Sequence, residues 1–171
     1  QAARLALGLH AKLRELGVPV WLDIRSDDKS ERAMRAAVEA ARFVVAIVSD
    51  GDGRTEGTAY FERDYCLKEL RWARAAGKHI QPVVDVADKH RIGEFLRAAP
   101  ADLRDLGQVD FVDLNVTDDE YFTVGAQKIL RKAEEAARAA PWDAARRAHA
   151  PTPEPALGPL ARRAHAATAG A

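Results

Sequence analysis

The chain has 171 residues, 47% of them hydrophobic, which is enough to form one domain with a substantial core plus an appendage. Its 26 basic residues balance its 26 acidic residues, so the overall charge gives no argument for a nucleic-acid or membrane partner. A single cysteine excludes an internal disulfide. Because the sequence also shows no membrane-spanning run and no signal-peptide pattern, we expect a reducing, cytoplasmic setting.

Helical and strand patterns alternate from the start of the chain. A stripe of leucines at helical spacing predicts a first helix: Leu5, Leu9, Leu13 and Leu16. Gly17 supplies the stop signal of this helix. The apolar run Val18 to Leu22, VPVWL, predicts a short buried strand, and the polar segment Asp23 to Lys29 predicts a turn.

The next segments predict a helix, a strand and a loop. Ser30 is placed to cap the helix, whose apolar face is expected to pack in the core: Ala33, Met34, Ala37, Val38 and Ala41. The β-branched run Phe43 to Val48, FVVAIV, shows no polar alternation, so we expect a strand covered on both faces in the middle of a parallel sheet. The Gly- and Asp-rich segment Ser49 to Thr58 is then a loop at the carboxyl edge, where open α/β sheets bind ligands.

The middle of the chain repeats this alternation. A helix is predicted from about Phe61 to Ala76, and Gly77 ends it. A strand follows at Ile80 to Val84, where Pro82 fits only if its missing donor falls at a ladder end or a bulge. After a short helix, the segment Val109 to Val112 mixes apolar and acidic residues, as an edge strand does.

The last third of the chain contains a final helix and a tail. Asp118 or Asp119 opens the helix, and its inward stripe is apolar: Phe122, Ala126, Ile129, Leu130 and Ala133. From Pro141 to Ala171 the chain is mostly Ala, Pro and Arg, so we expect a mobile tail that buries little apolar area. The folded domain is therefore expected to span residues 1–140.

The alternation of strands and helices predicts a doubly wound parallel α/β sheet with right-handed crossovers. The chain nevertheless opens on a helix, although a helix of this kind normally follows a strand at the centre of the sheet. Since the sequence also begins with Gln rather than Met, we expect the first strand and its loop to lie upstream of Gln1. The sheet should then show a gap beside Val18 to Leu22.

Glu69 is the strongest candidate for a reactive carboxylate. The residues three and four positions away on its helix are not basic, so none of them can form a helical ion pair with it: Tyr65, Cys66, Trp72 and Ala73. A carboxylate in apolar surroundings loses hydration, which raises its pKa and suits it to general-base or electrostatic work. The alternative is a surface glutamate whose stem lies on Trp72 while its head reaches water.

Other candidate chemistries are weaker. Three glycines follow a predicted strand, but their spacing is one residue too long for a dinucleotide-binding loop: Gly51, Gly53 and Gly57. The five histidines are scattered, and none has a second histidine or a cysteine at i+3 or i+4, so we predict no metal site. Cys66 is expected to be a buried core thiol rather than a nucleophile, and the basic tail has too few charges and aromatics for nucleic-acid recognition.

The order of these segments resembles the Toll/interleukin-1 receptor (TIR) domain family over roughly Leu5 to Ala136. The most specific part is YCLKEL, from Tyr65 to Leu70, followed by Gly77 and Pro82; it is similar to the family's aromatic-Cys-x-x-Glu helix and the strand after it. The resemblance implies a flavodoxin-like sheet of five strands and self-association to transmit signals. It also implies NAD cleavage in a subset of members, which use a glutamate on this helix at the position that Glu69 matches.

The chain departs from the family pattern in three places. The segment Ile24 to Lys29 is short and lacks the Gly and Pro common in the family's BB loop. The strand-to-helix loop that would supply other nucleotide contacts is absent, so no complete active site can be assembled from this sequence. Tyr65 stands where the family often has Trp, which retains an aromatic ring.

Two functions stay open. For an enzyme, the resemblance implies that NAD enters as substrate at the carboxyl edge of the sheet and that Glu69 stabilises the positive charge on the ribose as nicotinamide leaves. Trp21, Tyr60 and Tyr65 are the expected contacts for NAD. For a non-enzymatic adaptor, the segment Asp23 to Ser30 and a helix face bind other TIR domains, and Glu69 is structural. We expect TIR domains and NAD as partners, and no bound cofactor, nucleic acid or membrane.

Overall fold

The computed structural model describes residues 2–22, 28, 30–51 and 57–139. The chain divides into a first unit, Gln1–Ala140, and a second unit, Pro141–Ala171, and the helices and strands given below belong to the first. The predicted tail, and almost all of the predicted turn from Asp23 to Lys29, lie outside the described residues.

Within the described residues, three parallel strands form a sheet in the order β1–β2–β3: β1 is Phe43–Ile47, β2 is His79–Asp85 and β3 is Val112–Leu114. Phe43 lies opposite His79, and Val83 lies opposite Val112. Parallel pairing between strands that are separated by helices confirms the predicted doubly wound α/β fold.

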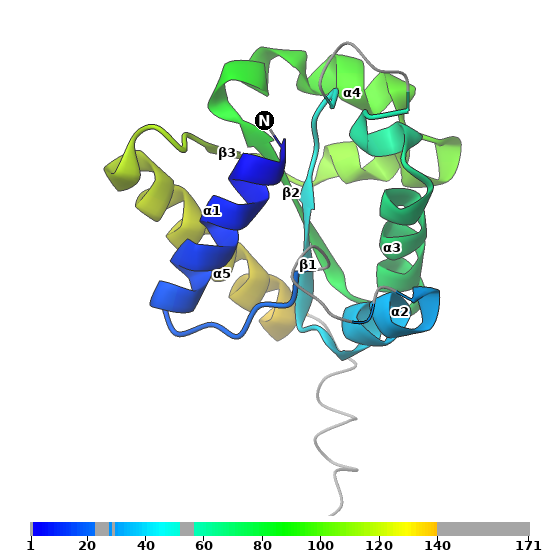
Figure 1. Cartoon of the computed structure of the whole chain (residues 1–171). Helices are drawn as coiled ribbons and strands as arrows, with labels where there is room; N and C mark the ends of the chain where they lie inside the picture. Colours follow the sequence, from blue (N-terminus) through cyan, green and yellow to red (C-terminus); the bar gives the residue numbers. More distant parts are fainter. Residues whose placement is uncertain (1, 23–27, 29, 52–56, 140–171) are drawn as a thin grey trace, which may run out of the picture. The chain divides into compact units, whose positions relative to one another are not determined.

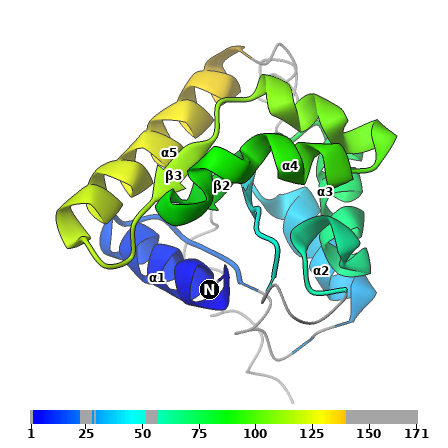
Figure 2. The same cartoon turned by 90° about the horizontal axis from the view of Figure 1, so that it is seen from above.

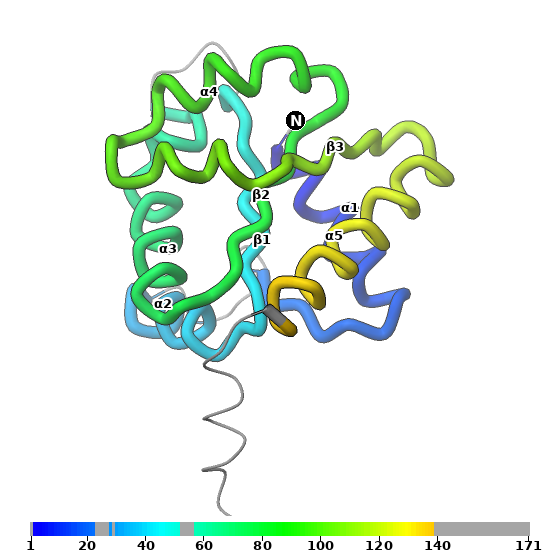
Figure 3. Tube along the Cα trace, turned by 180° about the vertical axis from the view of Figure 1, so that it is seen from behind, coloured from blue at the N-terminus to red at the C-terminus, as the bar shows by residue number. Residues whose placement is uncertain are grey.

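The helices lie in two layers, one on each face of the sheet (Figure 1, Figure 2). One layer contains α1 (Ala2–Glu15) and α5 (Asp119–Ala139), and the other contains α2 (Glu31–Ala40) and α3 (Asp64–Ala75). The view from behind shows the same division (Figure 3). Each layer has its own buried cluster. The α1 and α5 cluster includes Leu9, Val83, Leu114 and Ile129, and the α2 and α3 cluster includes Val38, Ala46, Leu70 and Val84.

The predicted helix signals act as expected. After α1, Gly17 has a φ of 80°, a left-handed conformation that glycine adopts without strain. Ser30 caps α2, since its hydroxyl oxygen accepts a hydrogen bond from the N–H of Ala33 at 3.2 Å. The carboxylate of Asp118 accepts from the N–H of Tyr121 at 2.9 Å and caps α5 in the same way.

The predicted helix from Phe61 to Ala76 consists of two pieces. A 3-10 turn, η2, covers Tyr60–Glu62. Arg63 is extended, with a φ of −83° and a ψ of 116°, and this kink starts α3 one residue later. The end of the helix is where the sequence places it, because Gly77 has a φ of 64°.

The proline in β2 is accommodated as predicted. Pro82 lies opposite Ala46 of β1, and pairing between β2 and β3 starts only at Val83. The donor that Pro82 lacks therefore falls at the end of this ladder. At this end of the ladder the side-chain amide of Gln81 donates hydrogen bonds to the carbonyl oxygens of Pro82 and Asp110, at 2.9 Å each.

Short helical segments connect β2 to β3: η3 (Val86–Arg91), α4 (Ile92–Ala98) and η4 (Ala101–Gln108). The last predicted strand is at the edge of the sheet, as expected, but it starts at Val112 rather than at Val109. Val109 is the residue that ends η4, and Asp110 bonds to the Gln81 side chain instead of to the β2 backbone.

Two predictions about the sheet are wrong. Val18 to Leu22 is not a strand, and among the described residues no strand pairs with it. β1 lies at the edge of the described sheet rather than in its middle, and most of its residues are only half-buried. A cavity is lined by both segments, and within the described residues no strand pairs with either of them there.

Candidate functional site

Glu69 lies in the second turn of α3, the helix that packs against β1 and β2. Its helix neighbours Leu70 and Ala73 are fully buried against the sheet, whereas Glu69 is half-buried. The helix thus holds this carboxylate at the border between the core and the solvent. This position is intermediate between the two alternatives that the sequence left open, a carboxylate in apolar surroundings and a surface glutamate.

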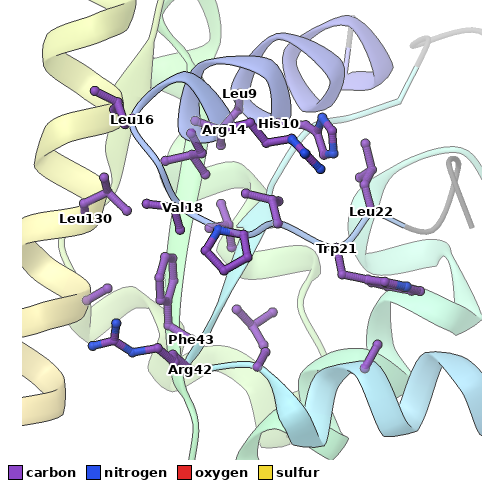
Figure 4. Close-up of a pocket in the computed structure, with 18 of the residues that line it drawn as sticks. Leu9, His10, Arg14, Leu16, Val18, Trp21, Leu22, Arg42, Phe43 and Leu130 are labelled. Carbon is purple, nitrogen blue, oxygen red and sulfur yellow. The ribbon is translucent and has the colours of Figure 1, made fainter.

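Glu69 lines a cavity of about 1060 Å³. Among the described residues, the other walls come from α1, residues 18–22, α2, β1 and α5 (Figure 4). Most of the lining is apolar, and a few charged or titratable side chains lie within it: His10, Arg14, Arg42, Glu69 and Glu134. The volume slightly exceeds the usual range for small-molecule sites, which is about 300–1,000 Å³.

Trp21 lines the same cavity as Glu69. It lies near the end of the 18–22 segment, on the side of the cavity next to α2 (Figure 4). Its side chain is 42% exposed, so part of the indole ring is accessible to a ligand. The structure therefore brings together two of the predicted site residues that are far apart in the sequence.

Tyr60 is buried rather than exposed to a ligand. Its relative exposure is 6%, its ring packs edge-on against Phe61 with 5.3 Å between the ring centres, and the Arg63 guanidinium lies 5.8 Å from the ring centre. Burial raises the pKa of Tyr60 well above its usual value, and the nearby Cys66 and Glu69 add to this rise. Tyr60 is thus a neutral core residue close to Glu69, and it is not among the described residues that line the cavity.

Tyr65 lies on the outer surface of α3, one turn before Glu69. Its side chain is 50% exposed, and the Lys68 ammonium lies 5.1 Å from the centre of its ring. Lys68 also forms ion pairs with Glu31 at 2.8 Å and with Asp64 at 3.0 Å, and these bonds raise the pKa of Lys68. Tyr65 is therefore part of a surface cluster that links α3 to α2, and it does not line the described cavity.

A family model of the TIR domain matches residues 1–123 of the chain. The chain belongs to this family. The match covers β1, β2, β3 and Glu69, and it identifies the protein as a signalling module that acts through TIR interactions. A search of curated proteins found no match. Within the described part of this TIR domain, no helix is long and apolar enough to cross a membrane.

Three residues at the cavity of this TIR domain were not singled out by the sequence: His10, Arg14 and Arg42. His10 is buried with 9% exposure and was considered only as a metal ligand. His10 and Arg14 lie one turn apart on α1, but Arg42 comes from the residue before β1, so no local spacing connects it to the other two. Within the described ranges, no group of three or more His, Cys, Asp or Glu residues is placed to hold a metal ion.

The basic side chains at the carboxyl edge of the sheet take part in ion pairs within the domain. Arg91 bonds to Asp50, in the loop after β1, and to Glu94 at 2.9 Å, and these hydrogen bonds raise the pKa of Arg91. Lys89 pairs with Asp113 of β3 at 3.0 Å. The pairs link η3 to the loop after β1 and to β3, although exposed ion pairs of this kind each contribute little to stability.

Proposed function

We propose that this TIR domain is an NAD⁺ hydrolase as well as an interaction module, and that Glu69 is its catalytic carboxylate. The observation that supports this proposal is the shared cavity, which combines a half-buried carboxylate with an accessible indole ring. Pockets with a mainly apolar lining and few polar groups are typical of small-molecule sites. The resemblance of the Tyr65 to Leu70 segment to the catalytic helix of NAD-cleaving members supports the same function.

The proposed reaction breaks the bond between C1′ of the ribose and the nicotinamide nitrogen. The electron pair of this bond stays on nicotinamide, which leaves as a neutral molecule, and positive charge develops on the ribose. The Glu69 carboxylate stabilises that charge in the transition state, and Trp21 stacks on a ring of the substrate. Water then forms the new C1′–O bond and releases a proton, so the products are nicotinamide and ADP-ribose.

The test is nicotinamide release by the wild-type chain and by Glu69→Gln at high protein density, because signalling through TIR interactions brings domains together. Glutamine keeps the shape of the side chain and removes its charge. We expect the rate to fall by about two orders of magnitude, which corresponds to about 3 kcal/mol of transition-state stabilisation. The melting temperature should stay near that of the wild type or rise, since a half-buried charge is removed.

Glu134→Gln is the matched control, because Glu134 lines the same cavity from α5 and lies on the other face of the sheet from α3. It should leave the rate unchanged. Trp21→Phe should retain more activity than Trp21→Ala, since phenylalanine keeps a ring for stacking. Activity that survives in Glu69→Gln refutes the catalytic role, and a folded, clustered wild type without activity favours the non-enzymatic adaptor.

A further inference from the structure

Two polar residues of β2 lie on the face of the sheet that α5 covers. Val83 belongs to the buried cluster of α1 and α5. Because the side chains of a strand alternate between its two faces, Gln81 and His79 lie on the same face as Val83. Gln81 is fully buried and His79 is half-buried. Polar side chains are unusual here, since a strand in a parallel sheet that helices cover on both faces is normally apolar.

Gln81 connects β2 to the segment before β3 and, through it, to α5. Its side-chain nitrogen donates to the carbonyl oxygens of Pro82 and Asp110, at 2.9 Å each. The carboxylate of Asp110 pairs with the ammonium of Lys132 on α5, at 3.0 Å. Asp110 thus bonds to Gln81 through its backbone and to Lys132 through its side chain. We call these three residues, together with His79, the His79 cluster.

Two buried atoms of the His79 cluster have no hydrogen-bond partner among the described residues: Nε2 of His79 and Oε1 of Gln81. A buried polar atom without a partner is unfavourable, and a buried charge without one is far more so. The neutral imidazole ring of His79 is therefore tolerated at this position much better than the imidazolium ion would be.

The charged groups around His79 also oppose its protonation. From α5, the positive charge of Lys132 acts on it. β1 places Phe43 directly opposite His79 and has no titratable side chain, and Lys78 precedes His79 in the chain. The segment before β3 contributes the carboxylate of Asp110, but this group is paired with Lys132 and its side chain is 87% exposed. A second positive charge would therefore be poorly compensated.

These surroundings set the direction in which His79 responds to pH. Burial lowers the pKa of His79 below its usual value, the Gln81 side chain opposes this fall without outweighing it, and Lys132 adds to it. Since the folded state then binds the proton less tightly than the unfolded state, the contribution of neutral His79 is present above about pH 6.5 and is lost as the pH falls through the folded pKa.

We propose that His79 is a pH-sensitive contact that holds α5 on the sheet only while its ring is neutral. Protonation places a second positive charge beside Lys132, on the face of β2 that α5 covers. The half of α5 that carries Lys132 then moves away from β2, because separation lets water hydrate both charges. The rest of the sheet stays paired, since the ladder between β1 and β2 does not involve these side chains.

The first measurement is an NMR titration of the His79 ring in the wild-type chain, with His79→Gln used to identify its signals. The midpoint should lie below about 6.5, the usual value for histidine. Lys132→Gln removes the neighbouring charge and should raise the midpoint. Lys128→Gln is the matched control, because Lys128 is exposed one turn earlier on α5, and it should leave the midpoint unchanged. A wild-type midpoint at or above the usual value, or equal effects of the two lysine variants, would overturn the proposal.

The second measurement is backbone amide exchange at about pH 7.5 and about pH 5, on either side of the usual histidine value, with each rate divided by its intrinsic rate at that pH. Protection of the amides from Ile129 to Ala136 should fall at the lower pH, by up to about tenfold for each pH unit between the unfolded and the folded pKa of His79. Protection of Ala46 in β1 should change little.

Two variants show whether His79 causes this loss of protection. His79→Gln cannot gain the charge, so α5 should stay protected at the lower pH. His90→Gln removes an exposed histidine of η3 instead and should show the wild-type loss. The same loss in His79→Gln, or an equal loss at Ala46, would refute a local release of α5. If His79→Gln does not fold, the wild-type and lysine-variant titrations still decide. None of these readouts depends on nicotinamide release.

Discussion

Replacing Gly125 by alanine should have two opposing effects on stability, a gain in helix propensity and a loss from crowding in the core. Gly125 is in α5, and a Cβ added there would lie 2.3 Å from Cδ2 of Leu114 on β3. Leu114 is fully buried, so its side chain has little room to move. Alanine is favoured over glycine in a helix by about 1 kcal/mol, but an overpacked core costs about 1–3 kcal/mol. We expect the second effect to win, so Gly125→Ala should lower the free energy of unfolding by up to about 2 kcal/mol.

Gly93→Ala is the matched control in a helix. Gly93 is exposed in α4, and the nearest atom to its added Cβ is Nη1 of Arg97 at 3.8 Å, so this variant should gain up to about 1 kcal/mol. Urea unfolding followed by circular dichroism gives both values. In a Leu114→Ala background the clash disappears, and Gly125→Ala should then be stabilising. A Gly125→Ala variant that is as stabilised as Gly93→Ala refutes the close packing of α5 on β3.

Two further predictions concern polar groups. Burial disfavours the charged form of Asp113, but hydrogen bonds from Tyr121 and Lys89 outweigh it and lower the pKa of Asp113 below its usual value. Because the pKa of Asp113 is lower in the folded state, this residue stabilises the fold above about pH 4 and loses the contribution as the pH falls through the folded pKa. In urea unfolding at several pH values, the stability of Asp113→Asn should therefore decrease less steeply toward acid pH than that of the wild type. A variant with the same acid dependence as the wild type contradicts this role. Gln81→Leu removes the donor shared by two carbonyl groups and should cost about 1–3 kcal/mol in urea unfolding, whereas wild-type stability would show that this amide is dispensable.

Local signals in the sequence predicted the helices well. The caps at Ser30 and Asp118 and the stop at Gly17 each depend on residues a few positions apart, and the structure forms all three. The parallel sheet was also predictable, since apolar runs alternate with helical stripes. Whether Val18 to Leu22 forms a strand was not predictable. A segment forms a strand only when another strand lies beside it, and its own sequence does not show whether that neighbour is present.

The candidate site was predictable only in part. The family resemblance pointed to Glu69 and its own helix neighbours, but the cavity depends on how distant elements pack. The placement of Trp21 at the same cavity as Glu69 is a result of that packing. Tyr60 has the same aromatic character as Trp21 in the sequence, yet the turn η2 directs it into the core. The extended Arg63 separates η2 from α3, and the sequence carries no clear signal for this break in the predicted helix.

Pro82 also affects how the domain opens. β2 pairs with β1 over five residue pairs but with β3 over only three, because the second ladder starts after the proline. The shorter ladder has fewer hydrogen bonds to break, so β3 and α5 should separate from the rest of the domain before β1 and β2 part. Brief detachment of this kind would expose the backbone groups of Val84, the β2 residue that faces β3, as a new sheet edge that could pair with another chain.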